Sequence, residues 1–536
     1  MQLFLGLQAY DCSVFGDQNI TVPVHLNFGK YILDCLRQMK DAVALINGTT
    51  GETLTIRQLL QYSVNLATSL TSLGIGNGDV VAIGSEKRIT YLPTVLSVLF
   101  TGATCTPYGL DSGKAILRQK LSVAKPTHLI CSKLFWERHE EVLNSCGSIK
   151  SYISFDCVQQ NALTIKDLVA KDIDIERYEP VRVLGQVDTT FILYSSGTTG
   201  APKGIRLTHL NSIMSSLPDN YKDEWNIQTA YILGEWNFNY DTFMTFKLLY
   251  AGKKVVYIDD VTILNILQCI EKYQINILMV LPYQLNLIIK AEALERFNLE
   301  TLTIIYSRST LLHKNTIEQV KQRLPKLQHI LQGYGMTECG EPTSEIRAVK
   351  GPRPGSVGMA APGITIKIVD LKNDIKLGPN QSGEIRVRGP MLMKEYIGLD
   401  PSIYLDEEGF LKTGDVGYYD DDKYLYIVER MKYLINYQGN KIAPLQLENL
   451  LEMHPNVLEA SVIGKPDPDD GEIPMAFVVK RLESEVTEEE LLDYLASEVP
   501  KYMQLKGGVK FIDKLPRSPR GKILRRHLGE MLNQFP

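Results

Sequence analysis

The chain has 536 residues, of which 44% are hydrophobic and 22% are charged, a composition typical of folded domains that excludes an extended disordered chain. A chain of this length can bury more than one core, so two or three domains are expected. The formal net charge of -5, without a run of basic residues, argues against a nucleic-acid partner. A bound polyanion would therefore have to be held by local groups.

Helices and strands alternate through the first part of the chain. Apolar residues at helical spacing predict a helix over 53–73, with Thr55 and Gln58 as a capping box. A second helix is expected over 91–100. Short apolar runs predict buried strands at 79–83, 127–130, 191–193, 254–258 and 277–280. This alternation indicates layered α/β domains built on parallel sheets.

A loop rich in glycine and hydroxyl groups follows the strand at 191–193, where it is expected to leave a sheet edge. Glycines let backbone N–H groups approach a phosphate, hydroxyls donate hydrogen bonds, and a lysine neutralises charge. The order matches neither the Walker loop nor Gly-x-Gly-x-x-Gly, and alone it is equally compatible with a solvated turn. The candidate nucleotide-binding residues are Ser195, Ser196, Gly197, Thr198, Thr199, Gly200 and Lys203.

The pattern changes after about residue 340. Isoleucines at every second position over 364–368, followed by a Gly/Pro/Asn turn, predict a small barrel-like antiparallel subdomain over about 340–430. Residues 431–536 combine strands with a helix at 487–499, which indicates a smaller α+β domain. A unit of roughly 100 residues can fold separately and move on the large domain of residues 1–430.

A glycine-rich stretch at 333–338 carries further binding groups. Its glycines permit close approach to a flat ring, its tyrosine can stack on adenine, and its glutamate can hold a divalent cation. Alone, the stretch is equally compatible with a turn that carries a surface glutamate. The candidate site residues are Gly333, Tyr334, Gly335, Thr337 and Glu338.

Three later stretches, taken singly, are weaker evidence for nucleotide binding. The carboxylate of Asp415, in Thr-Gly-Asp, can accept hydrogen bonds from both ribose hydroxyls. Arg430 and Lys432 lie at the expected domain junction, where an isolated charged pair is usually solvated. Lys522 lies in a basic loop stiffened by proline, which is compatible with a surface tail.

In this order, the five stretches resemble the signatures of the adenylate-forming (AMP-binding) superfamily, in the branch of acyl-CoA synthetases, 4-coumarate CoA ligases and firefly luciferases. The resemblance implies that ATP, Mg²⁺ and CoA act on a fatty or aryl carboxylic acid, which becomes acyl-AMP and then a thioester. It implies that Lys522 is the adenylation lysine and that Thr337 and Glu338 act with it. It further implies that Arg430 contacts ribose or phosphate, that Lys432 is the hinge, and that Glu338 and Thr198 hold the metal.

The expected reaction explains why cations are needed. A carboxylate that attacks the α-phosphate of ATP brings two anions together, which costs roughly 4 kcal/mol at 4 Å and an effective dielectric near 20. Mg²⁺ and the Lys522 ammonium offset this repulsion.

Three positions depart from the family pattern. Residues 234–240 contain no histidine where relatives carry one in the acyl pocket, so Asn237 or Phe238 takes that place. Arg308 lies where relatives keep small residues, and it either points away or binds a substrate carboxylate or polar tail. Asn436 replaces a lysine that is common after the hinge. The predicted substrate-binding residues are Phe238, Asn239, Arg308 and Ser309.

An acid:CoA ligase is the main hypothesis. A luciferase-like oxygenase and a nucleotide-binding pseudoenzyme without turnover are the alternatives, and a domain that loads a carrier protein is less favoured. The eight cysteines are scattered, no apolar run approaches ~18 residues, and the chain ends in Asn-Gln-Phe-Pro rather than Ser-Lys-Leu. We therefore expect an intracellular, cytoplasmic protein without an integral membrane segment, as a monomer or weak homo-oligomer.

Overall fold

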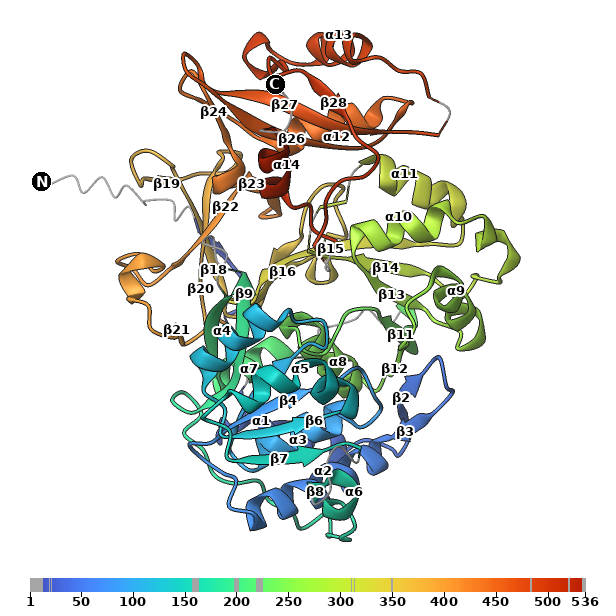
Figure 1. The fold of residues 1–536 in the computed structure, drawn as a ribbon, viewed down its shortest axis with the longest axis vertical. Coiled ribbons are helices and arrows are strands. Elements are labelled where there is room, and N and C mark those ends of the chain that lie inside the picture. The colour runs from blue at the N-terminus through green and yellow to red at the C-terminus, as the bar shows by residue number, and fades with distance from the viewer. Residues whose placement is uncertain are drawn as a thin grey trace, which may run out of the picture.

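The computed structural model describes residues 13–18, 20, 22–156, 163–196, 202–217, 225–309, 311–312, 314–348, 350–482, 484–518 and 521–532. In these ranges, four sheets and their helices build a large N-terminal domain and a smaller C-terminal domain of mixed α/β structure (Figure 1). This architecture confirms the predicted fold class. No helix within the described ranges has the length and apolar character that crossing a bilayer requires.

An eight-stranded sheet has the order β21-β10-β9-β5-β4-β6-β7-β8, and it is parallel from β9 to β8. Its strands are β4 (Val80–Gly84), β5 (Thr104–Tyr108), β6 (His128–Cys131), β7 (Ser151–Ser154), β8 (Leu163–Thr164), β9 (Thr189–Ser196), β10 (Pro202–Thr208) and β21 (Glu395–Tyr396). The helices of this part of the chain are α1 (Phe28–Arg37), α2 (Ile56–Ser72), α3 (Tyr91–Phe100), α4 (Lys114–Ala124), α5 (Lys133–Asn144), α6 (Ile165–Leu168) and α7 (His209–Ser216).

A nine-stranded sheet has the order β17-β16-β15-β14-β13-β11-β12-β2-β3, with a parallel centre and antiparallel edges. Its strands are β2 (Val43–Asn47), β3 (Thr53–Thr55), β11 (Thr229–Ile232), β12 (Lys254–Tyr257), β13 (Ile277–Val280), β14 (Ile304–Ser307), β15 (His329–Met336), β16 (Gly340–Ser344) and β17 (Met359–Ala360). Its helices are α8 (Asn239–Tyr250), α9 (Ile263–Lys272), α10 (Pro282–Lys290) and α11 (Lys314–Arg323).

An antiparallel sheet follows in the order β1-β18-β20-β22-β23, with β19 paired to β18. Its strands are β1 (Val14–Phe15), β18 (Thr365–Val369), β19 (Lys376–Leu377), β20 (Gly383–Arg388), β22 (Leu411–Tyr419) and β23 (Leu425–Arg430). The short 3-10 helices of the chain include η2 (Glu292–Arg296), η3 (Glu345–Arg347), η4 (Pro401–Ile403), η5 (Met431–Tyr433) and η6 (Lys501–Met503). This sheet therefore joins the first described strand to residues more than 300 positions later.

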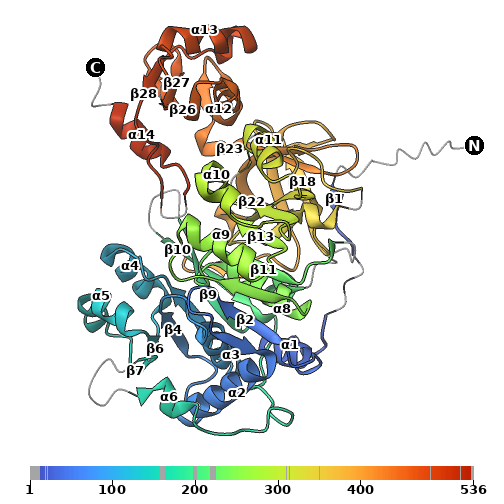
Figure 2. The same ribbon diagram turned by 90° about the vertical axis from the view of Figure 1, so that its right-hand side faces the viewer.

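The C-terminal domain lies at one end of the molecule (Figure 2). It has its own five-stranded sheet and its own apolar core. The strands are β24 (Ile435–Tyr437), β25 (Asn440–Ile442), β26 (Val457–Asp467), β27 (Gly471–Lys480) and β28 (Val509–Phe511), and the helices are α12 (Pro444–Met453), α13 (Glu488–Glu498) and α14 (Arg525–Leu532). β26 and β27 form a long antiparallel pair, and β28 adds to β27 in parallel.

The start of α2 corrects one sequence prediction. Residues 53–55 form strand β3, and the helix begins at Ile56 rather than at residue 53. Thr55 is the N-cap: its side chain accepts from the Gln58 backbone N–H, while the Gln58 side chain accepts from the Thr55 backbone N–H. The predicted capping box is confirmed, and it sets the boundary because a cap residue has extended backbone angles.

Candidate functional site

The β9–β10 hairpin frames the predicted phosphate loop. Ser195 lies opposite Lys203 and Ser196 lies opposite Pro202 in the antiparallel ladder. β10 also pairs with β21, and Nζ of Lys203 lies 5.1 Å from the ring centroid of Tyr396. The loop residues Gly197, Thr198, Thr199 and Gly200 lie outside the described residues. The hairpin thus brings the start and end of the loop beside a tyrosine that no motif marks.

Glu338 lies in the turn between β15 and β16, and only 4% of its surface is exposed. The Tyr396 hydroxyl donates to its Oε1 at 2.7 Å. Burial and the Glu338 charge raise the pKa of Tyr396, so that this hydroxyl remains a donor. Gly335 is needed for the hairpin itself, because a Cβ there would overlap the carbonyl oxygen of Gly340.

Buried Tyr334 and Asp415 form one cluster with Arg430, whose side chain is 44% exposed. The Tyr334 hydroxyl donates to Oδ2 of Asp415 at 2.8 Å, and Nε of Arg430 lies 3.0 Å from Oδ1. Asp415 and Arg430 are directly paired across β22 and β23. Burial raises the pKa of Asp415, while Arg430, the Tyr334 hydroxyl and the Lys522 ammonium oppose that rise. Three predicted nucleotide-binding residues are therefore in direct contact.

Lys522 lies on the loop between β28 and α14. Arg517 and Ile523 pair across this loop, and the Ser518 N–H donates to the Lys522 carbonyl at 2.8 Å. The adjacent Gly521 has a φ of +72° and packs against the ring of Tyr283 on α10. Because its ammonium acts on the pKa of Asp415, Lys522 brings a charge of the C-terminal domain to the cluster on the large domain.

The junction between the domains carries the predicted hinge. Lys432 is exposed within η5, between β23 and β24. Nearby, Nη2 of Arg525 on α14 lies 2.9 Å from Oε2 of Glu448 and 3.7 Å from Oε2 of Glu429 on β23. Burial raises the pKa of Glu429, and Arg525 opposes the rise. An ion-pair network therefore links the C-terminal domain to the last strand before the hinge.

The predicted substrate-binding residues lie at the ends of α8 and β14. Phe238 is the N-cap residue of α8, and Nδ2 of Asn239 donates to the Thr337 carbonyl at 3.4 Å. Ser309 is exposed and has a φ of +80°, a left-handed conformation that favours glycine. Arg308 does not extend into solvent. Its guanidinium forms a two-point ion pair with Asp241 on α8.

The Arg308–Asp241 pair is buried, with 11% and 2% of the two side chains exposed. The guanidinium carbon also lies 3.9 Å from the ring centroid of Tyr240. Removing one member of a buried pair leaves the other charge uncompensated, which typically costs about 3–5 kcal/mol. Arg308 is therefore held in place by contacts with Asp241 and Tyr240. Sequence reasoning missed Asp241, Tyr396 and Tyr283, none of which stands out by spacing or motif.

The residues present fit a partial Mg²⁺ site. Within the described ranges, no three His, Cys, Asp or Glu side chains converge as a complete metal-binding group. Mg²⁺ is, however, commonly held by one or two carboxylates together with substrate phosphates and water. The buried carboxylate of Glu338, oriented by Tyr396, supplies such a hard oxygen donor.

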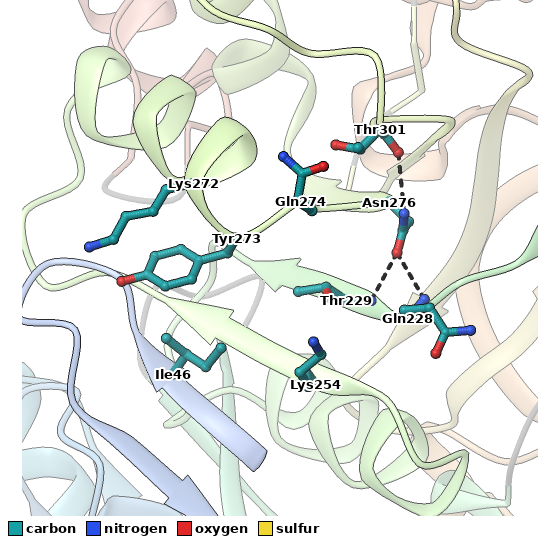
Figure 3. Close-up of a pocket in the computed structure, with 9 residues that line it drawn as sticks. All are labelled: Ile46, Gln228, Thr229, Lys254, Lys272, Tyr273, Gln274, Asn276 and Thr301. Carbon is teal, nitrogen blue, oxygen red and sulfur yellow. Dashed lines mark hydrogen bonds between the residues drawn. The ribbon is translucent and has the colours of Figure 1, made fainter. Parts of the chain in front are cut away.

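A hollow of about 510 Å³ lies elsewhere, at the amino ends of strands in the nine-stranded sheet (Figure 3). There, Oδ1 of Asn276 accepts from the backbone N–H groups of Gln228 and Thr229. Ligands of parallel α/β sheets bind outside the carboxyl ends of the strands, where residues 307–309 and 333–338 lie. The hollow is therefore separate from the candidate site.

Comparison with protein-family models gives two matches. The model described as AMP-binding enzyme matches residues 34–397, and the model described as AMP-binding enzyme C-terminal domain matches residues 446–522. These two matches fall on the large and the small domain of the structure.

Similar proteins with assigned activities span nearly the whole chain. A luciferin 4-monooxygenase of Nipponoluciola cruciata is 32% identical over 507 residues, which cover 92% of each protein. 4-Coumarate-CoA ligase 1 of Narcissus pseudonarcissus is 31% identical over 531 residues, covering 96% of this chain and 95% of the ligase. The solved structure of ATP-bound MatB from Rhodopseudomonas palustris aligns with a TM-score of 0.83 at 25% identity, covering 94% of this chain and 98% of MatB.

Proposed function

The chain belongs to the AMP-binding enzyme family, and from this membership we propose that it is an acid:CoA ligase that activates a carboxylic acid with ATP. In the first step a carboxylate oxygen bonds to the α-phosphorus of ATP, and pyrophosphate leaves. In the second step the CoA sulfur attacks the acyl carbonyl carbon, the thiol loses its proton, and AMP leaves. The 4-coumarate-CoA ligases among the relatives support the CoA step.

The cluster of Tyr334, Asp415 and Arg430 has the chemistry to bind the ribose. Asp415 accepts from the ribose hydroxyls in this proposal, and Arg430 favours the ionised form of its carboxylate. Tyr334 fixes the orientation of that carboxylate through its hydroxyl, and its ring can stack on the base. Ser195, Ser196 and Lys203 serve the phosphates, as donors and as a counter-charge.

Lys522 supplies the mobile positive charge of the first step. Its ammonium donates to the acid carboxylate and to the α-phosphate, and so lowers the repulsion between two anions as they approach. Glu338 would hold Mg²⁺, which adds charge neutralisation on the phosphates when bound. The hinge at Lys432 would then let the C-terminal domain withdraw Lys522, so that CoA can reach the adenylate.

One observation carries the proposal: Gly521, which precedes Lys522 in the small domain, packs against the ring of Tyr283 in the large one, and the Lys522 ammonium opposes the rise in the pKa of Asp415 that burial causes. The test is acid-dependent release of pyrophosphate. Lys522→Ala is expected to abolish this release and to retain attack of CoA on a preformed acyl-adenylate, because the lysine acts only in the first step. Lys514→Ala, which changes an exposed lysine of the same domain, is the control. Release that survives Lys522→Ala, or no release with any acid, contradicts the proposal.

A second candidate function is a luciferase-like oxygenase, which the luciferin 4-monooxygenases among the relatives favour. The absence of histidine from residues 234–240 argues against it. Light from candidate luciferins with ATP and oxygen distinguishes it from a ligase. A pseudoenzyme is distinguished by a rise in melting temperature with ATP and no formation of AMP.

A further inference from the structure

Polar and charged side chains lie around Arg308, one of the predicted substrate-binding residues. Arg308, at the end of β14, is paired with Asp241 on α8, and its Nη1 lies 3.3 Å from Oδ2 of that carboxylate. Its guanidinium lies on the ring of Tyr240. Tyr240 in turn lies parallel to Tyr306, with ring centroids 6.3 Å apart and an interplanar angle of 8°.

The same layer continues to Glu341 on β16. The Tyr306 hydroxyl donates to Oε1 of Glu341 at 2.5 Å, and Nζ of Lys247 lies 3.8 Å from its Oε2. The side chains of Lys247 and Glu341 are 3% and 9% exposed. We refer to Asp241, Lys247, Arg308 and Glu341, with Tyr240 and Tyr306, as the charged layer.

The charged layer lies directly against the Gly333–Glu338 motif. A Cβ at Gly333 would overlap the Tyr306 hydroxyl and come within 2.8 Å of Oε1 of Glu341. Ser307, which precedes Arg308, is paired with Gln332 in the next strand. Asn239, two residues before Asp241, donates to the Thr337 carbonyl. The layer therefore borders both the Gly333–Glu338 motif and the predicted substrate-binding residues, so that in the proposed function the tail of the bound acid faces it.

From this arrangement we infer that the site takes short carboxylic acids whose tails carry a hydrogen-bonding oxygen, and that it excludes long unbranched alkyl acids. The inference rests on the proposed function. Within the described chain, Nε of Arg308 and Oγ of Ser307 are buried polar atoms without a hydrogen-bond partner. An oxygen on the tail can accept from them, whereas a methylene chain leaves them unsatisfied.

A long alkyl tail meets a second obstacle. It would have to displace the Arg308 guanidinium, and Asp241 would then remain buried without its cation. Small residues at this position, as in the family pattern, would instead leave room for a chain. Arg308 and Asp241 are thus specificity-determining residues: they limit the length of the acid's tail and favour a polar tail.

The test compares acids of matched length by kcat/KM for pyrophosphate release. Hexanoate, 6-hydroxyhexanoate and adipate vary the tail oxygen, and dodecanoate and hexadecanoate vary the length. We expect an oxygen-bearing tail to be preferred about tenfold or more, because unpaired polar groups in a site reject apolar analogues. Dodecanoate and hexadecanoate should give no release above background.

The variant Arg308→Gln/Asp241→Asn removes both charges together and so leaves no unpaired ion in the layer. It is expected to lose the preference for oxygen-bearing tails and to gain activity with dodecanoate. Arg88→Gln/Asp156→Asn removes a two-point Arg–Asp pair outside the site and should keep the wild-type ranking. If the first variant does not fold, the wild-type panel and the next measurement still decide the question.

Thermal shift provides a readout that requires no turnover. Non-hydrolysable acyl-sulfamoyl adenosines with hexanoyl and 6-hydroxyhexanoyl tails should raise the melting temperature of the wild type unequally, more for the hydroxylated tail. Equal shifts, or equal use of dodecanoate and the short acids, would overturn the inference and leave the proposed ligase activity intact. Absence of pyrophosphate release from every acid would overturn both.

Discussion

The backbone of Gly521 packs against the ring of Tyr283, so that a β-carbon at position 521 would overlap the ring carbons. Gly521 belongs to the small domain and immediately precedes Lys522, whereas Tyr283 belongs to α10 of the large domain. Lys522 therefore follows a residue that packs directly against an aromatic ring of the large domain. Any side chain at 521 must therefore move the lysine loop away from Tyr283.

Gly521→Ala is expected to slow adenylation about 100-fold, since a shift of roughly 1 Å at a catalytic group has an effect of that size. Attack of CoA on preformed acyl-adenylate should be unaffected. Gly508→Ala is the matched control, because Gly508 has a φ of +84° and a Cβ added there would meet no atom within 4 Å. Equal losses in both variants would show that backbone strain, and not contact with Tyr283, is responsible. Tyr283→Ala should partly restore Gly521→Ala.

Binding of ATP is expected to weaken as the pH falls through the raised pKa of Asp415. Only the ionised carboxylate accepts from both ribose hydroxyls, and burial moves its protonation to a higher pH than that of an exposed aspartate. Arg430 favours the ionised form, so Arg430→Gln should move the midpoint of this loss to still higher pH. Calorimetric titration with ATP across a pH series measures the midpoint. Arg388→Gln, an exposed arginine of the same sheet, should leave it in place, and a midpoint that does not move in Arg430→Gln would refute the assignment.

Tyr396→Phe is expected to destabilise the protein by about 1.5–3 kcal/mol, because it removes a hydrogen bond to the buried Glu338 carboxylate. The loss should shrink when ATP and Mg²⁺ are added, since a cation at Glu338 replaces the lost donor. Denaturant unfolding with and without the ligands gives both values. Tyr231→Phe serves as control, because the Tyr231 hydroxyl is buried without a hydrogen-bond partner among the described residues. An undiminished loss with ligands would argue against a metal at Glu338.

Substitution of the two adjacent arginines of α14 is expected to change the free energy of unfolding by very different amounts. The Arg525 side chain is 13% exposed between Glu448 and Glu429, and Arg525→Gln should cost about 3–5 kcal/mol of stability. The Arg526 side chain is 85% exposed beside Glu530, and Arg526→Gln should cost at most about 0.5 kcal/mol. Denaturant unfolding, monitored by a probe in the C-terminal domain, measures the loss of stability in each variant. Similar values for the two variants would mean that the network at the domain junction is not a stabilising contact.

Helices and strands that depend only on the pattern of neighbouring residues could be predicted from the sequence. The helix expected over 91–100 coincides with α3, and the strand expected at 277–280 coincides with β13. Both depend on local periodicity, which the chain carries within a few residues. The start of α2 differed because three residues before the helix found a strand partner in β2, and pairing of that kind is not a local property.

The contacts within the site depend on residues far apart in the chain. Motif resemblance selected Tyr334 and Asp415 separately, but their hydrogen bond joins positions 81 residues apart. Arg308 stood out as a departure, yet its orientation follows from Asp241, 67 residues away, which no motif marks. Sequence reasoning therefore identified candidate groups, whereas their partners required the fold.

The loop that carries Lys522 is held at both ends. β28, before it, is hydrogen-bonded to β27, and after it Arg525 donates to the Val462 carbonyl of β26 at 2.9 Å. In the proposed mechanism, the backbone of Lys522 therefore moves away from Asp415 together with the whole terminal sheet. When this movement limits the rate, steady-state turnover should depend on solvent viscosity. The rate of the chemical step at the phosphorus atom should not depend on it.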